Sequence, residues 1–162
     1  MILLIIYYAM LLVILSNMIY DIYKYIDRKG KWISFKESID LAELPVITFY
    51  QGTNKFNFLL DTGSNYSHIS PSASKLLKAD YNKSFLKISG IGSGESNIKC
   101  SSELYYKKSK YIIELYVTPH LDNAFDTIKK ETGVKIHGIL GNQFFQKYKY
   151  VLDFDKLIAY SK

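Results

Sequence analysis

The sequence has little cysteine, and its positive charge is not concentrated anywhere. The single cysteine, Cys100, cannot form a disulfide within the chain, so nothing here implies an oxidising compartment. The formal net charge of +6 comes from scattered lysines, which are typical of a solvated surface and argue against nucleic-acid binding. His68, His120 and His137 share no metal-ligand spacing with Cys100. We therefore predict no metal site and no cofactor.

Two familiar enzyme patterns are also missing. The nucleophile-elbow pattern Gly-x-Ser-x-Gly is absent, which argues against a hydrolase triad built from Ser64 and His68. The glycine-rich stretch from Gly90 to Gly94 lacks the further glycine of a dinucleotide fingerprint, since Glu95 stands at that place. The residues after Glu95 are typical of a strand, whereas the fingerprint requires a helix there.

A long apolar segment opens the chain. With 162 residues there is room for one globular domain plus an extra segment. Residues 2–20 carry no charge, and a helix of that length nearly matches the hydrocarbon layer of a bilayer, about 30 Å thick. We predict a transmembrane anchor helix over residues 1–26 and a linker over residues 27–40. A cleaved signal peptide is the alternative, but this segment has no Lys or Arg before the apolar run and no small-x-small cleavage site after it.

Charges after this segment bear on orientation. The basic residues Lys24, Arg28, Lys29 and Lys31 outnumber the acidic residues Asp21 and Asp27. Positive flanks tend to remain in the cytoplasm, so a single-pass membrane protein with a cytoplasmic C-terminal domain is expected. A signal peptide would instead make the protein periplasmic or secreted.

The remainder, residues 41–162, consists of short β-rich runs. Residues 44–50 and 55–61 are two such runs with a hairpin turn between them. Ser70 followed by Pro71 predicts a short helix, and a second helix begins near Asp122 and ends at Gly133. Many strands with one or two short helices predict a mostly β fold, a compact barrel.

The segment NFLLDTGSNYSHIS places Asp61 directly behind an apolar strand. A carboxylate in that place costs free energy unless it is paired with another group, exposed to solvent or required for a function. Asp-Thr-Gly also makes a good turn, so a turn aspartate is the simplest alternative. The context favours a function, because Ser64 follows the glycine and an apolar Ile139-Leu140-Gly141 motif occurs later.

These two segments resemble the retropepsin-like aspartic proteases of bacterial or phage type, single-domain relatives of pepsin that retroviruses also possess. FLLDTGSNYSHIS resembles their catalytic loop. HGILGNQFFQKYKYVLDFD resembles their apolar-apolar-Gly motif, which a short helix and a strand ending in Asp-Phe follow. The resemblance covers residues 44–160. It implies an acid-protease barrel in which Asp61 is the catalytic residue.

The chemistry calls for two carboxylates. Peptide hydrolysis without a metal needs a base to activate water and an acid to protonate the carbonyl oxygen, and two neighbouring carboxylates that share one proton supply both. The full motif occurs once, since Asp126-Thr127-Ile128 lacks the glycine. The second carboxylate would therefore be Asp61 of another copy, in a homodimer. We predict a membrane-anchored aspartic endopeptidase that acts on polypeptides.

The resemblance also assigns supporting roles. Gly63 would permit the tight turn and donate its amide to the carboxylate, and Thr62 would reach the partner's matching loop. The Ser64 hydroxyl would hydrogen-bond the ionised Asp61. Retroviral relatives carry an arginine that supports the dimer where this chain has Asn142. The resemblance therefore does not predict which contacts hold this dimer together.

The stretch Gly90, Ile91, Gly92, Ser93 and Gly94 would be the flap that closes over the substrate, with an ordinary hairpin loop as the alternative. A rival function keeps the fold and loses the chemistry. In that case the protein would be a catalytically inactive, membrane-tethered peptide-binding or scaffold domain.

Overall fold

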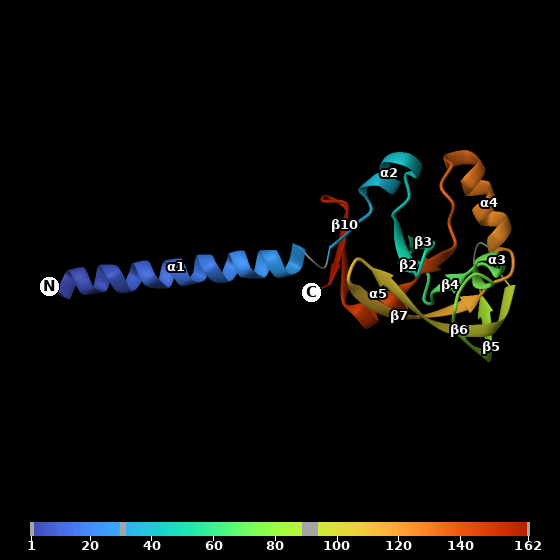
Figure 1. Ribbon diagram of the computed structural model, residues 1–162. Coiled ribbons are helices and arrows are strands. Elements are labelled where there is room, and N and C mark those ends of the chain that lie inside the picture. Colours follow the sequence, from blue (N-terminus) through green and yellow to red (C-terminus); the bar gives the residue numbers. More distant parts are fainter. Residues whose placement is uncertain (1, 30–31, 89–93, 162) are drawn as a thin grey trace. The chain divides into compact units, whose positions relative to one another are not determined.

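The computed structural model describes residues 2–29, 32–88 and 94–161, and Figure 1 shows its elements in order. The chain forms two compact units, Met1–Trp32 and Ile33–Lys162. The first unit is built on a single helix, α1 (Ile2–Lys29). The second holds every strand and four shorter helices.

Helix α1 exposes large apolar side chains on its described part; Leu12 and Ile19, for example, are 67% and 66% exposed. A helix was predicted here, and it is present. Within the residues that the structure describes, however, no helix is both long enough and apolar enough to cross a membrane. The predicted transmembrane helix over residues 1–26 is therefore not supported, and the helix itself extends through charged residues to Lys29.

The main sheet of the second unit has seven strands in the order β2-β3-β8-β4-β7-β6-β5. Tyr50 on β2 also pairs with Tyr105 on β6, which brings the sheet round on itself. The prediction of a mostly β, barrel-like domain is confirmed. The strands are β2 (Val46–Gln51), β3 (Asn54–Leu60), β4 (His68–Ile69), β5 (Asp80–Ile88), β6 (Gly94–Tyr106), β7 (Ser109–Val117) and β8 (Gly138–Leu140).

A smaller sheet joins the two ends of the second unit. It contains β1 (Ile33–Ser34), β10 (Ile158–Ser161) and β9 (Tyr150–Asp153), with β10 in the middle. Ile33 and Phe35 are 0% and 1% exposed, so this segment belongs to the core. Residues 33–42, most of which the sequence assigned to a linker, thus form β1 and helix α2 (Lys36–Ala42).

Local sequence signals explain two helices. The Ser70 hydroxyl caps α3 (Pro71–Ser74) by accepting the Ala73 amide at 3.3 Å, with proline at the first position. Helix α4 (Leu121–Thr132) ends at Gly133, whose φ of 76° suits glycine. Helix α5 (Asn142–Tyr148) is the short helix expected after the apolar-apolar-Gly motif. With α2, the described part of this unit has four helices, more than the one or two of the predicted fold class.

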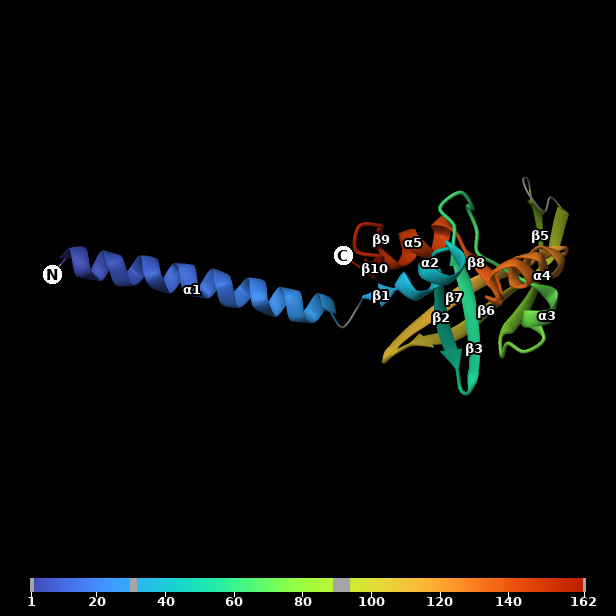
Figure 2. The same ribbon diagram turned by 90° about the horizontal axis from the view of Figure 1, so that it is seen from above.

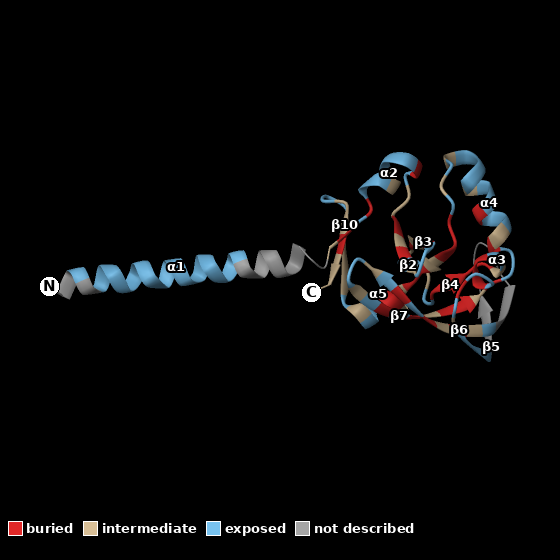
Figure 3. Cartoon of the chain, viewed as in Figure 1, coloured by how far each residue is buried: buried red, intermediate tan, exposed pale blue. Residues whose placement is uncertain are grey.

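Two apolar clusters hold the unit together, and Figure 3 shows buried residues gathered on the strands. In the larger cluster, alternate residues of β2 and β3 face inward, namely Ile47, Phe49, Phe56 and Phe58. The smaller cluster joins α4 to the opposite face of β2, β3 and β8, with Val46, Leu121, Phe125 and Ile136 buried. Residues on both faces of the β3–β8 pair are therefore fixed by packing.

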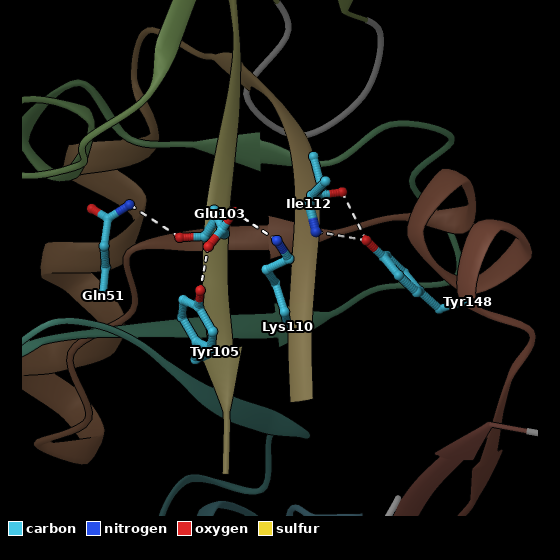
Figure 4. A network of polar contacts seen from close by, with 6 residues as sticks. All are labelled: Gln51, Glu103, Tyr105, Lys110, Ile112 and Tyr148. Carbon is cyan, nitrogen blue, oxygen red and sulfur yellow. Dashed lines mark hydrogen bonds and ion pairs between the residues drawn. The ribbon is translucent and has the colours of Figure 1, made fainter. Parts of the chain in front are cut away.

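Side chains fasten β7 to its neighbours (Figure 4). Glu103 receives a hydrogen bond from the Tyr105 hydroxyl and pairs with Lys110 at 3.1 Å. On the other edge of β7, the Tyr148 hydroxyl accepts the Ile112 amide at 2.7 Å and donates to the Ile112 carbonyl at 2.9 Å. Because Tyr148 ends α5, these bonds fix that helix against the open edge of β7.

Candidate functional site

Asp61 lies where two neighbouring strands end. β3 and β8 are parallel, and Leu60 pairs with Leu140 at their last residues. β4 pairs with the other edge of β8 in antiparallel fashion. Residues 61–67 must therefore cross from one side of β8 to the other, and Figure 2 shows this loop beside β8. The aspartate is placed at the start of the crossing.

Backbone and side-chain bonds fix Asp61. Its amide donates to the Leu140 carbonyl at 3.0 Å, so the strand pairing extends to the aspartate itself. Its Oδ1 accepts the Gly63 amide at 2.8 Å, as the sequence predicted. A Cβ on residue 63 would lie 3.1 Å from that Oδ1, a tight approach that glycine avoids. The carboxylate is half-buried and oriented by the backbone.

The start of helix α5 holds the rest of the loop. The Asn142 side-chain amide donates to the Thr62 carbonyl at 2.8 Å, and the Asn142 backbone amide donates to the Ser64 carbonyl at 2.8 Å. The Gln143 amide donates to the Asn65 carbonyl at 3.0 Å. Free amides at a helix start thus bind the loop carbonyls. Sequence reasoning noted Asn142 only as a departure from the family pattern.

Gly141 is the point of closest approach between α5 and the loop. Its amide donates to the Ser67 hydroxyl at 3.1 Å. A Cβ at this position would come within 2.7 Å of the Ser64 carbonyl oxygen, and nearer still to the carbonyl oxygen of Tyr66. The structure thereby brings Gly141, the last residue of the predicted apolar-apolar-Gly motif, against the loop of Asp61. The Leu140 carbonyl accepts the Asp61 amide, and Ile139 pairs with Leu59 of β3.

The Ser64 hydroxyl has a different partner from the one expected. It donates to the Tyr66 carbonyl at 2.7 Å and so closes a short turn within the loop. Its single proton is then not directed at Asp61. The Thr62 side chain is exposed and makes no hydrogen bond to any residue that the structure describes. It is free to meet a partner molecule.

Most of the predicted flap falls outside the described residues. Gly90, Ile91, Gly92 and Ser93 belong to that gap. Gly94 is described, begins β6 and pairs with Ile88 of β5. The two strands therefore form the predicted hairpin up to the edge of the gap.

A histidine and an ion pair lie near the loop. His68 on β4 is buried, which lowers the pKa of its ring, and the negative charge of Asp61 partly offsets this effect. Further along the same face, Lys99 pairs with Glu114 at 2.9 Å, and Glu114 also accepts the Gln143 side-chain amide at 2.7 Å. No motif in the sequence marks Lys99 or Glu114, because only the strand register brings them near the loop.

His137 has a structural role beneath the site. Its Nδ1 accepts the Asn57 amide at 3.0 Å, and its own amide donates to the Asn57 carbonyl at 2.8 Å. The ring thus extends the pairing of β3 with β8. Burial, together with the charge of Lys135, lowers the pKa of His137 from 6.5 to about 4.

We expect His137 to make the protein sensitive to acid. A histidine whose pKa is lower in the folded state stabilises the fold fully above its unfolded pKa, and the fold loses that stability as pH falls. Between pH 6.5 and about 4 the free energy of unfolding should fall. At about 1.4 kcal/mol per pKa unit, the largest possible loss is roughly 3 to 4 kcal/mol. Urea unfolding of the full chain across this pH range measures it.

The variant His137→Asn retains an acceptor near the Nδ1 position but does not titrate. Its unfolding free energy should depend less on pH over this range than that of the parent. His120→Asn is the matched control, because His120 is exposed and its φ of 71° is one that asparagine tolerates. Parallel pH curves for His137→Asn and the parent would contradict the assignment.

A cleft of about 380 Å³ lies elsewhere on the unit. It is bounded by α2, by the outer face of β2 and by the turn after α4, and its lining includes Leu41, Thr48, Tyr50 and Lys135. Asp61 does not line this cleft. No pattern in the sequence predicted it.

Comparisons with known proteins were made for the sequence and the structure. No protein-family model matches the sequence, and no curated protein matches it. Among solved structures, the chain is similar to one described as EIAV protease complexed with the inhibitor HBY-793. The TM-score is 0.48 and the sequence identity is 17%, over 71% of this chain and 97% of that one.

Proposed function

We propose that this chain is an aspartic endopeptidase that works as a homodimer, with one Asp61 from each copy. One observation carries the proposal: a single carboxylate stands at the joined ends of β3 and β8 and accepts the Gly63 amide at 2.8 Å, in a loop whose next two residues are exposed. Such a loop holds half of a two-carboxylate site in place and leaves it open to a second molecule.

The chemistry of the pair follows from the proximity of two acids. Two carboxylates a few ångströms apart cannot both ionise, so they share one proton and titrate together. The ionised member takes a proton from a water molecule, whose oxygen attacks the peptide carbonyl carbon. The protonated member gives its proton to the carbonyl oxygen. When the carbon–nitrogen bond breaks, the leaving amine takes up a proton from the pair.

Two features of this chain support the dimer. Thr62 and Gly63 are exposed, although they adjoin a half-buried carboxylate. The Asn142 side chain donates to the Thr62 carbonyl at 2.8 Å and so braces the part of the loop that would meet the partner. In this chain Asn142 thus secures the loop from within one copy. Two-fold symmetry would then bring identical loops together on the axis.

Mixing the parent with an inactive copy tests the dimer. Adding an equal amount of full-length Asp61→Asn to the full-length parent should reduce peptide cleavage to about half, because random pairing places many parent chains in mixed dimers with one carboxylate. Adding an equal amount of Asp126→Asn, an exposed carboxylate of α4, should not reduce it. Cleavage that is unaffected by added Asp61→Asn would refute the two-copy site.

The proposal also concerns where the protein is located in the cell. We infer that α1 attaches the chain to a lipid bilayer, because its described apolar side chains, among them Leu12 and Ile19, are exposed. Attachment would confine the copies to one surface and raise their effective concentration. Co-sedimentation of the full chain with lipid vesicles measures the attachment, and a chain left wholly in the supernatant would refute it.

A further inference from the structure

The cleft of about 380 Å³ lies apart from Asp61 and has no part in the proposed function. Helix α2, the outer face of β2, Tyr106 of β6 and residues 133–135 contribute to its lining. Figure 1 shows α2 and α4 on the same side of β2 and β3. The volume is within the range of ligand sites, roughly 300 to 1,000 Å³. The cleft is thus large enough for a small molecule or a short piece of peptide.

Strand β2 is the last strand of the main sheet on its side, and its outer edge is partly free. The Ser38 hydroxyl of α2 accepts the Val46 amide at 2.8 Å and donates to the Val46 carbonyl at 3.1 Å. Tyr50 pairs with Tyr105 of β6, and the pairing of these two strands stops there. Thr48 lies midway between Val46 and Tyr50, so its N–H and C=O also point away from β3. No described residue bonds them.

Large side chains in the cleft are exposed. Leu41 of α2 is 63% exposed, and Tyr50 is 39% exposed. Thr48 and Asn57 pair across β2 and β3, and both are partly exposed. The Thr48 hydroxyl donates to Asn57 Oδ1 at 2.8 Å. Ligand sites combine apolar surface of this kind with a few polar groups. The free backbone groups of Thr48 therefore share the cleft with uncovered apolar side chains.

Two opposite charges line the same cleft. Glu37 lies in the first turn of α2, and Lys135 lies on the segment after α4. Both are exposed, and neither side chain makes an ion pair or a hydrogen bond with a described residue. The Asn57 side-chain amide donates to the Lys135 carbonyl at 2.7 Å, which fixes the Lys135 backbone against β3. A ligand that carries one basic and one acidic group complements these two charges.

We propose that the cleft binds an extended peptide segment, which pairs as an added strand with the free edge of β2 at Thr48. One N–H and one C=O of the peptide bond the Thr48 C=O and N–H. A basic side chain of the peptide pairs with Glu37, an acidic one pairs with Lys135, and an apolar one covers Leu41. Main-chain bonds supply affinity in this mode of binding, and side-chain contacts supply specificity. The inference goes beyond the proposed function, because Asp61 does not line the cleft.

A charged peptide and its neutral twin test the chemistry of the ligand. Acetyl-Lys-Leu-Glu-amide is the charged probe, and acetyl-Gln-Leu-Gln-amide is a twin of similar size. Isothermal titration calorimetry should show that the full-length chain binds the charged peptide about fivefold more tightly, because two exposed ion pairs are formed. Full-length Asp61→Asn should bind both peptides as the parent does, and there the probe cannot be cleaved at Asp61.

Variants at the two charges locate them in the complex. Replacing only the lysine, or only the glutamate, of the probe by glutamine should weaken binding to the parent about twofold. In Glu37→Gln the lysine replacement should have no effect, and in Lys135→Gln the glutamate replacement should have none. The matched controls are Glu131→Gln on α4 and Lys83→Gln on β5. Both residues are exposed and lie outside the lining, so these variants should bind as the parent does.

Methylation of the peptide backbone tests the strand pairing. An N-methyl group removes one amide donor of the charged probe, so at one position it should lower the affinity at least about fivefold. A scan in which no position matters would overturn the pairing at Thr48, and equal affinity of the charged and neutral peptides would overturn the charged ligand. Neither measurement depends on the folding of a variant. Peptide binding by a parent that cleaves no peptide would refute the proposed function and leave this inference intact.

Discussion

Replacing Asp61 by asparagine is expected to abolish peptide cleavage by the full-length chain. The amide can neither take a proton from water nor share one with a second carboxylate, so both the base and the acid of the pair are lost. A general acid–base group contributes roughly 10²- to 10⁴-fold to a rate, and here one substitution removes both members. We therefore expect kcat/KM to fall by at least about 10³-fold, measured on a peptide library by mass spectrometry.

The fold should survive this substitution, because the asparagine carbonyl can still accept the Gly63 amide that Asp61 Oδ1 accepts at 2.8 Å. Near-ultraviolet circular dichroism should match that of the parent. Asp126→Asn is the matched control and should cleave normally, since Asp126 is an exposed residue of α4 in the motif copy that lacks the glycine. Peptidase activity retained in Asp61→Asn would refute the assignment of Asp61.

Local patterns predicted the parts of the fold that local chemistry determines. The end of α4 was predicted because glycine commonly ends a helix with a positive φ, and Gly133 does so with a φ of 76°. The start of α3 was predicted because serine is a favoured cap, and Ser70 caps that helix. Helix α2 was not predicted, because Phe35 precedes it and makes no side-chain cap. Its position follows instead from the buried Ile33 and Phe35, which bind the segment to the core.

At the candidate site, only contacts between residues that are close in the sequence could be predicted. Asp61 and Gly63 are two positions apart in the sequence, and their hydrogen bond could be expected. The contacts of Asn142 with Thr62 and Ser64 join residues about 80 positions apart, and they depend on β3 and β8 lying side by side. The partner of the Ser64 hydroxyl was wrongly expected for a different, local reason. The tightness of the turn, which a sequence does not express, brings the Tyr66 carbonyl within reach.

The pairing of Leu59, Ile139, His68, Tyr116 and Lys99 in one row across the main sheet is a further consequence of register. Tyr116 and Lys99 belong to one hairpin, so their pairing is local. Leu59, Ile139 and His68 come from three segments, and a shift of one residue in any strand would turn its side chain to the other face. Gly141 allows the loop of Asp61 to lie close to the end of β8, because a Cβ at this position would come within 2.7 Å of the Ser64 carbonyl oxygen.

Replacing Gly141 by alanine is expected to destabilise the fold strongly. The added Cβ would approach the backbone carbonyl oxygens of Ser64 and Tyr66, at 2.7 Å and closer, and neither atom can rotate away. The loop would have to separate from α5, losing the bond from the Gly141 amide to the Ser67 hydroxyl. We expect the free energy of unfolding to fall by at least about 3 kcal/mol, with peptide cleavage lost.

Gly133→Ala separates this steric effect from the general cost of replacing a glycine. A Cβ at residue 133 meets nothing within 4 Å, and the only penalty is the positive φ of 76°, about 1 kcal/mol. Gly141 has a φ of −95°, which alanine adopts readily, so its penalty arises from the contact alone. Urea unfolding of both full-length variants gives the comparison. Equal stability of the two would mean that the loop yields to the methyl group, and that Asp61 is held less firmly than its hydrogen bonds indicate.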